Sequence, residues 1–83
     1  MFSIEFSPTA KKQLAKLENP VQSRVISVLE RIQYRPFSFV IKLSGLPYYR
    51  LRVGDYRVLL EIEQKKQVIL VAEVGHRKNI YDL

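Results

Sequence analysis

The chain has 83 residues, enough for one small domain that we expect to span residues 1–83. It contains no cysteine and one histidine, which excludes a disulfide framework and a thiolate metal site and argues against an all-protein zinc site. No apolar run approaches the ~20 residues of a membrane-spanning helix, and the N-terminus lacks the layout of a signal peptide. We therefore expect a soluble, cytoplasmic protein that uses no cofactor.

Positive charge is concentrated in the middle of the chain. Fourteen Lys and Arg residues against eight Asp and Glu give a net charge of +6, and residues 31–57 hold six of these cations against the single acid Asp55. Localised positive charge favours a polyanionic partner, most often nucleic acid, although a solvated basic face would have the same composition. Outside the hairpin described below, we expect these cations to contact nucleic acid: Arg31, Arg35, Lys42 and Lys78.

The N-terminal part of the chain predicts one strand and two helices. Residues 2–6 alternate apolar and polar side chains, the pattern of a half-buried strand. Ser7-Pro8 and Asn19-Pro20 each combine a capping residue with a proline that fits the first helical turn, so we expect helices over residues 9–18 and from residue 21 onward. In the second helix apolar residues recur every three or four positions up to Ile32. The short link between them favours an antiparallel helical hairpin.

The C-terminal half predicts three strands. Pro36 ends the second helix, and residues 35–47 form a connector with some extended character. Runs of β-type residues follow over 48–53, 56–63 and 67–74, and Gly54-Asp55 between the first two is typical of a two-residue hairpin turn of the primed type. The last run is apolar on both faces except at Glu73, as in a central, covered strand. The order β-α-α-β-β-β indicates an α+β fold in which a helical hairpin packs on an antiparallel sheet.

The tight turn also predicts the register of the hairpin. With Val53 opposite Tyr56, Arg52 lies opposite Arg57, and Arg50 shares their face because side chains alternate along a strand. The other face is apolar and is expected to form a core: Tyr49, Leu51, Val53, Tyr56, Val58 and Leu60.

Two interpretations of the arginine face remain open. Directly opposed like charges cost about 0.2–1 kcal/mol, a cost that is understandable if an anion binds between them, and the planar guanidinium suits phosphate. Alternatively, the three arginines lie on a solvated sheet face that Asp55 or Glu61 partly neutralises.

The tail after the last strand carries further candidates for RNA chemistry. It contains His76, Arg77 and Tyr81, and it can turn over the arginine face because it follows a central strand. RNA cleavage without a metal needs an activated 2′-hydroxyl, stabilisation of charge at phosphorus and help for the departing 5′-oxygen. Arginines stabilise the charge, but guanidiniums hold their protons too firmly to be good bases or acids, so proton transfer falls to His76, Tyr81 or a partner. Alternatively, His76 is a surface residue, Tyr81 packs beside Ile80 and Leu83, and the protein is not an enzyme.

The chain resembles the RelE toxins of toxin–antitoxin modules over essentially its whole length. The most specific stretches are KLSGLPYYRLRVGDYRVLLEI and VGHRKNIY, and the opening IEFSPTAKKQLAKLENPVQSRVISVLERI is similar to the strand and helices of that family. The resemblance implies a ribosome-dependent endoribonuclease that cuts mRNA in the decoding site and leaves a 2′,3′-cyclic phosphate and a 5′-hydroxyl. It also implies a cognate RelB-like antitoxin that holds the toxin inactive.

Carried over position by position, the resemblance implies a catalytic set of five residues. The two family lysines before the tight turn fall on Arg50 and Arg52, and the arginine after it falls on Arg57. The arginine after the last strand falls on Arg77, and the tyrosine that stacks on the nucleotide falls on Tyr81. Two departures follow: no lysine is available as a general base, and the Arg77–Tyr81 spacing is shorter than in the bacterial prototype.

The wider RelE/ParE superfamily leaves two other activities open. A ParE-like toxin shares the fold but lacks the ribonuclease residues and acts on DNA gyrase. A non-catalytic RNA- or ribosome-binding protein would block decoding by occupancy alone. The arginine cluster and the tail favour the ribonuclease.

Overall fold

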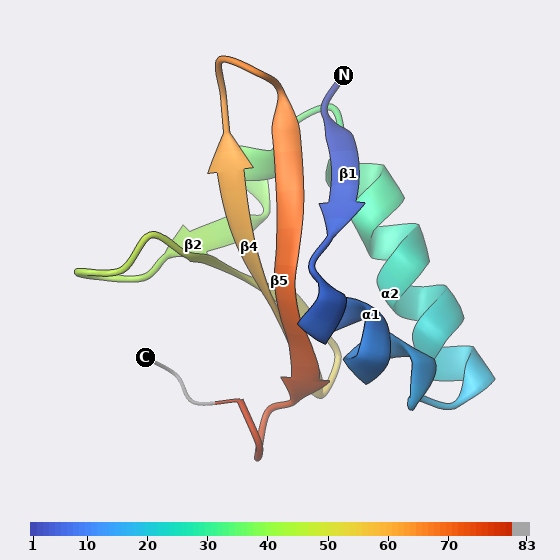
Figure 1. Ribbon diagram of the computed structural model, residues 1–83. Coiled ribbons are helices and arrows are strands. Elements are labelled where there is room, and N and C mark those ends of the chain that lie inside the picture. The colour runs from blue at the N-terminus through green and yellow to red at the C-terminus, as the bar shows by residue number, and fades with distance from the viewer. Residues whose placement is uncertain (81–83) are drawn as a thin grey trace.

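The computed structural model of the protein, which describes residues 1–80, has the expected α+β fold (Figure 1). Within these residues a five-stranded sheet carries two α-helices on one of its sides. The elements in chain order are β1 (Ser3–Phe6), α1 (Pro8–Ala15), α2 (Asn19–Ile32), the 3-10 helix η1 (Pro36–Ser38), β2 (Val40–Lys42), β3 (Tyr49–Val53), β4 (Tyr56–Glu63) and β5 (Val68–His76). No helix in residues 1–80 is long and apolar enough to cross a membrane.

Both helices begin close to the predicted positions. The Oγ atom of Ser7 accepts a hydrogen bond from the Ala10 N–H at 3.0 Å and caps α1 as expected. The second helix starts at Asn19 itself, after Glu18 in an extended conformation. Helix α1 ends three residues earlier than predicted, because residues 16–18 are needed to turn the chain into α2.

The sheet has the strand order β1-β5-β4-β3-β2. Strands β2 to β5 pair antiparallel, but β1 pairs parallel to β5, so the expectation of a purely antiparallel sheet is wrong. Almost the whole chain separates β1 from β5, and no hairpin turn sets their relative direction. The predicted connector was also incomplete, since it contains η1 and the short edge strand β2.

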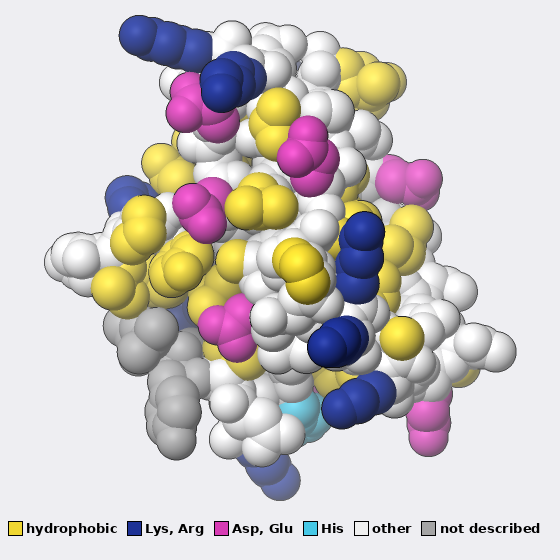
Figure 2. Space-filling view, in the orientation of Figure 1, with side chains coloured by type: hydrophobic (Ala, Val, Ile, Leu, Met, Phe, Trp, Pro, Cys, Tyr) yellow, Lys and Arg dark blue, Asp and Glu magenta, His cyan; other side chains and the backbone are white. Residues whose placement is uncertain are grey.

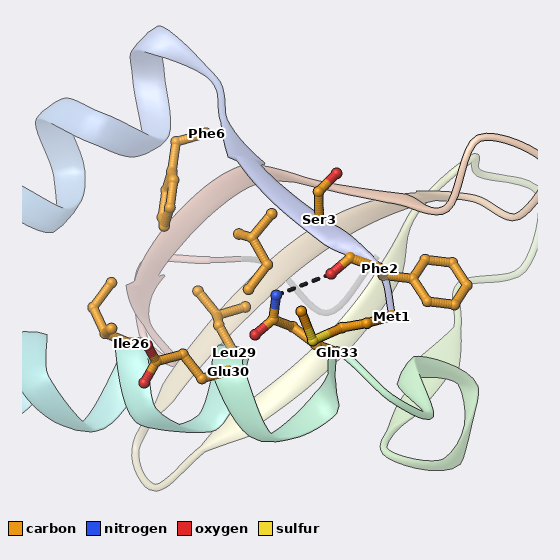
Figure 3. Close-up of a pocket in the computed structure, with 9 residues that line it drawn as sticks. Met1, Phe2, Ser3, Phe6, Ile26, Leu29, Glu30 and Gln33 are labelled. Atoms are coloured by element: carbon orange, nitrogen blue, oxygen red, sulfur yellow. Dashed lines mark hydrogen bonds between the residues drawn. The ribbon is translucent and has the colours of Figure 1, made fainter.

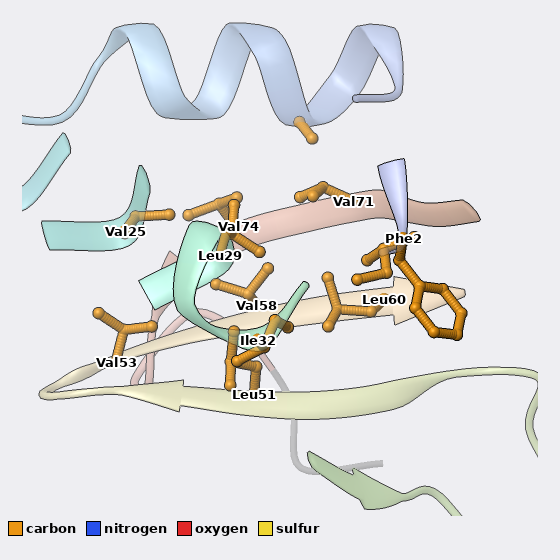
Figure 4. Packing of buried hydrophobic residues seen from close by; sticks show 12 residues of the cluster. Phe2, Val25, Leu29, Ile32, Leu51, Val53, Val58, Leu60, Val71 and Val74 are labelled. Atoms are coloured by element: carbon orange, nitrogen blue, oxygen red, sulfur yellow. The ribbon is translucent and has the colours of Figure 1, made fainter. Parts of the chain in front are cut away.

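The helices cover one face of the sheet, and the main core lies between them (Figure 4). We call this the helical face, and the opposite side the open face. The buried side chains of this main core come from α1, α2 and the three strands β3 to β5: Ala10, Val25, Leu29, Ile32, Leu51, Val53, Val58, Leu60, Ile69, Val71 and Val74, together with Phe2. A smaller cluster on the open face joins Leu43 from the β2–β3 connection to Leu59 and Ile80.

A β-bulge in β5 breaks the alternation of its side chains. Leu60 pairs with Val71, but Leu59 pairs with Glu73, which leaves Ala72 as the extra residue. Both Val71 and Val74 consequently reach the core, three positions apart. Helix α1 satisfies main-chain groups here: the Ser7 hydroxyl donates to the Ala72 carbonyl at 2.8 Å, and Gln13 Oε1 accepts the Val74 N–H at 2.7 Å.

Candidate nucleic-acid interface

The β3–β4 hairpin has the predicted register and gathers three arginines on the open face. Arg52 and Arg57 are direct partners across the ladder, and Arg50 lies two residues earlier on β3. Their side chains line a hollow of about 170 Å³ together with Phe39 and Ile41. Arg52 is exposed, whereas Arg50 and Arg57 are half-buried. We call this the arginine hollow.

Arg57 is held in place by the turn that precedes it. Its Nη1 atom donates to the carbonyl oxygens of Gly54 and Tyr56, both at 3.0 Å. Gly54 has φ +58°, while Asp55 has no positive φ, which fits a primed turn with glycine at its first central position. The guanidinium of Arg57 is therefore fixed beside Arg52 by local bonds before any ligand arrives.

Arg77 lies beside the same turn. Its backbone N–H donates to the Asp55 carbonyl at 2.8 Å, which ties the start of the tail to the hairpin. The Asp55 carboxylate lies 3.9 Å from Nε of Arg77, an exposed pair that contributes little to stability. Glu61, the other acid considered above, does not line the arginine hollow and lies instead at two hollows farther along the sheet.

Within the described residues, the tail folds back over the open face as far as Ile80. Ile80 lies directly above Gly75, and a Cβ atom built on Gly75 would be 2.9 Å from Cγ1 of Ile80. Gly75 is in turn the ladder partner of Arg57, so the tail crosses the sheet next to the arginine hollow. Tyr81, the predicted stacking residue, lies outside the described residues.

His76 is not brought together with the arginines. It is the ladder partner of Tyr56, and the two rings meet edge to face with centroids 5.2 Å apart. Partners across a ladder share a face, so His76 lies on the helical face, where it lines a hollow with Gln13 of α1 and with Leu17 in the link to α2. Its Nδ1 accepts the N–H of Lys78 at 3.1 Å, which puts the proton of a neutral ring on Nε2.

The other predicted cations lie outside the arginine hollow. Arg31 is in the last turn of α2, and Arg35 follows that helix; both are exposed. Lys42 is the ladder partner of Tyr49, donates to the Leu46 carbonyl and lies 5.2 Å from the Tyr49 ring centroid. Lys78 is exposed in the turn after β5.

Three residues near the site were missed by the sequence analysis. Phe39 and Ile41 line the arginine hollow because they flank Val40 at the start of β2, and their alternation around Val40 was the available signal. Arg24 of α2 lies near the hairpin turn, with Nη1 3.1 Å from a Cβ built on Gly54. Only the fold reveals this approach, since Arg24 reads in sequence as an ordinary exposed helical residue.

Acidic side chains mark the rest of the open face. Figure 2 shows acidic and apolar side chains over β4 and β5, with basic ones over α1 and at the tip of the β4–β5 hairpin. The acids that line the two hollows in this region are Glu5, Glu61, Glu63 and Glu73. A polyanion is repelled here and attracted by the arginine hollow, so the charge distribution directs it to the β3 end of the sheet.

A separate groove of about 400 Å³ lies between β1 and α2 (Figure 3). Its lining is apolar apart from Ser3, Glu30 and Gln33, and Gln33 Nε2 donates to the Phe2 carbonyl at 2.9 Å. This groove offers apolar contact area rather than groups for RNA chemistry.

Comparison with known proteins identifies the family. Residues 4–81 match the family described as the ParE toxin of the type II toxin–antitoxin system, parDE. The chain belongs to the RelE/ParE superfamily of toxins. It is 31% identical to Toxin RelE3 of Methanocaldococcus jannaschii over an alignment of 83 residues that covers 93% of this chain and 92% of that protein. The resemblance to RelE toxins is thereby confirmed, and the protein is a RelE-family toxin of a toxin–antitoxin system.

Solved RelE structures share the fold. The archaeal RelE–RelB complex from Pyrococcus horikoshii contains a chain with a TM-score of 0.80 and 28% identity, covering 95% of this chain and 98% of that one. The E. coli RelBE toxin–antitoxin complex contains one with a TM-score of 0.77 and 27% identity, covering 92% and 96%.

Proposed function

We propose that this RelE-family toxin is a ribosome-dependent endoribonuclease that cuts mRNA in the decoding site without a metal ion. The observation that supports it most is the arginine hollow, in which Arg52 and Arg57 face each other and Arg50 lines the same space. A fold selected only for stability would place opposite charges at positions 52 and 57, because opposed like charges are destabilising. A bound phosphodiester offsets that cost by accepting hydrogen bonds from the guanidiniums.

The proposed reaction is an in-line attack by a 2′-hydroxyl oxygen on the adjacent phosphorus. The bond from phosphorus to the 5′-oxygen breaks, giving a 2′,3′-cyclic phosphate and a 5′-hydroxyl end. The negative charge that develops on the phosphoryl oxygens is stabilised by the three arginines of the hollow: Arg50, Arg52 and Arg57. Arg77 does not line the hollow but is bonded to the neighbouring turn, from which its side chain would reach the same phosphate. Proton transfer is assigned outside the hollow, to Tyr81 or to the ribosome, because His76 lies on the other face of the sheet.

The proposed partners follow from this activity and from the relatives. The similar proteins from P. horikoshii and E. coli form complexes with a RelB antitoxin, and we propose that a RelB-like antitoxin binds this toxin as well. The ribosome and its mRNA would be the substrate complex, which places the activity in the cytoplasm. Arg31, Arg35, Lys42 and Lys78 are exposed and available for contacts to ribosomal RNA.

Primer extension on an mRNA bound to purified ribosomes tests the proposal. We expect cuts inside the decoding-site codon when the toxin is present and an intact message when the same RNA is free. Arg57→Ala and Arg77→Ala should reduce cleavage by at least tenfold while ribosome binding persists. Lys11→Ala, an exposed change on α1, is the matched control and should cut normally.

Other results would favour the alternatives. Stalled translation with an intact message would indicate a non-catalytic inhibitor that acts by occupancy. Normal translation combined with inhibited gyrase would indicate a ParE-like activity, which the parDE description of the matching family makes the natural second candidate.

A further inference from the structure

The arginine hollow has an apolar wall that phosphate binding does not require. Ile41 is the ladder partner of Arg50, and Phe39 precedes Val40, the partner of Leu51, so Phe39 lies alongside Arg52. Both are large hydrophobic groups, yet the Phe39 side chain is 48% exposed and the Ile41 side chain is 58% exposed.

Phe39 differs from the neighbouring aromatic residues Tyr34 and Phe37 in its surroundings rather than in its exposure, since all three are exposed and only Phe39 lines the arginine hollow. The Phe37 ring contacts the rings of Phe2 and Tyr49 edge to face, with centroids 6.4 and 5.5 Å away, and so packs toward the helical face. Tyr34 is 73% exposed and lines none of the hollows described above. Phe39 is thus an exposed ring held next to fixed positive charge.

We propose that Phe39 and Ile41 form a subsite that stacks one unpaired RNA base next to the phosphate bound by the arginines. The proposal rests on the proposed function in taking RNA as the ligand. Single-stranded nucleic acid is commonly bound by a positive groove that follows the backbone and by aromatic rings on which bases stack. The arginine hollow combines these two elements within neighbouring strands.

The size and charge of the site favour this occupant. A volume of about 170 Å³ is below the 300–1,000 Å³ typical of small-molecule pockets, so it suits part of one nucleotide rather than a whole small-molecule ligand. The three guanidiniums provide complementarity to a phosphodiester, and the base attached to that backbone is the nearest flat, weakly polar group. Because every base has a π-face, this contact would add affinity with little sequence preference.

Binding of a short, fluorescein-labelled single-stranded RNA, measured by anisotropy, tests the subsite. Two labelled probes are compared. The base-containing probe carries 2′-deoxy sugars so that it cannot be cleaved, and the abasic probe has the same backbone but lacks bases. We expect Phe39→Ala to weaken binding of the base-containing probe by about 5- to 100-fold and to leave the abasic probe unchanged. Phe39→Trp should restore binding, and Tyr34→Ala should bind as the unsubstituted protein does.

Three results would overturn the subsite. Equal losses on both probes would indicate that Phe39 supports the arginines rather than a base. Unchanged RNA binding with weakened capture of the antitoxin would assign the apolar wall to the toxin–antitoxin interface. Failure of the unsubstituted protein to bind the base-containing probe more tightly than the abasic one would also refute it.

The subsite and the proposed function fail in different ways. RNA binding that depends on Phe39, combined with an intact message on ribosomes, would keep the subsite and refute the nuclease. Cleavage on ribosomes that is indifferent to Phe39→Ala, together with unchanged RNA binding, would keep the nuclease and refute the subsite.

Discussion

Reversing one charge of the opposed arginine pair is expected to stabilise the fold and abolish function. Arg52 and Arg57 are ladder partners, and two hydrogen bonds to the turn keep Arg57 from moving away. An opposed like-charge pair costs about 0.2–1 kcal/mol, and an opposite-charge pair contributes a similar amount. Arg52→Glu removes the like-charge repulsion and adds an opposite-charge attraction, so the free energy of unfolding should rise by about 0.4–2 kcal/mol. For a domain of this size each kcal/mol raises Tm by about 4–8 °C.

Urea and thermal unfolding followed by circular dichroism would measure the change. Because Arg52 is exposed and Arg57 is only half-buried, the gain should shrink between about 0.1 M and about 1 M salt, as the Debye length falls from about 10 Å to about 3 Å. Lys11→Glu is the control for net charge, since it changes the total by the same amount on α1. A carboxylate near the N-terminus of a helix is also stabilised by the helix dipole. The stability gained by Lys11→Glu is therefore an upper bound on what the lower net charge alone contributes.

The outcome that refutes the reasoning is specific. If Arg52→Glu is no more stable than Lys11→Glu, or if its gain is insensitive to salt, the opposed arginines carry no strain for a phosphate to relieve. Arg52→Gln should fall between the unsubstituted protein and Arg52→Glu. Both variants should lose cleavage on ribosomes, which would show stability and function to be opposed at this position.

Two further predictions concern the segments that position the site. Gly75→Ala should destabilise the protein by about 1–3 kcal/mol and reduce cleavage on ribosomes, because a Cβ atom there would lie 2.9 Å from Cγ1 of Ile80 and displace the tail from the arginine face. Unfolding curves would measure the stability and primer extension the cleavage. Unchanged values would show that the tail does not need this close approach. Gln13→Leu should lower the free energy of unfolding by about 1–3 kcal/mol, because it leaves the Val74 N–H without its acceptor at the bulge. Amide hydrogen exchange at Val74 should accelerate, and unchanged exchange would contradict this role of Gln13.

The hairpin was predictable because its determinants are local. A two-residue turn at Gly54 fixes which residues face each other, and alternation then assigns Arg52 and Arg57 to one face and the apolar residues to the other. The cap at Ser7 is local in the same sense. These features required no knowledge of how distant segments meet.

The features that the sequence analysis missed depend on distant contacts. The parallel pairing of β1 with β5 joins the two ends of the chain, where no turn sets the direction. The bulge at Ala72 is stabilised by Ser7, the N-cap of α1, and by Gln13 within that helix, and an apolar strand gives no sign of it. A strand as short as β2 gives too few residues for a period-two pattern, so the apolar wall of the site was hidden in the connector.

The assignment of proton transfer is affected most by these distant contacts. In sequence His76 follows an apolar strand beside Arg77, yet in the fold the sheet separates its ring from the arginines. The hollow itself is lined by three guanidiniums and two hydrocarbon side chains, none of which accepts a proton near neutral pH. Under the proposed function, the group that activates the 2′-hydroxyl therefore comes from outside the hollow, which gives a physical reason for dependence on the ribosome.

A substitution that places an amine in the hollow tests this last point. Arg52→Lys keeps the positive charge but replaces the planar fork by a point charge, so we expect cleavage on ribosomes to fall by a few-fold. If the proton acceptor lies elsewhere, the pH–rate profile should keep the shape it has in the unsubstituted protein. If the lysine took over as general base, the rate would instead climb with pH as the neutral amine accumulates, since neighbouring cations lower the pKa of an amine. A new limb in the profile, or cleavage of free RNA by Arg52→Lys, would show that position 52 can accept the proton and that the external assignment is wrong.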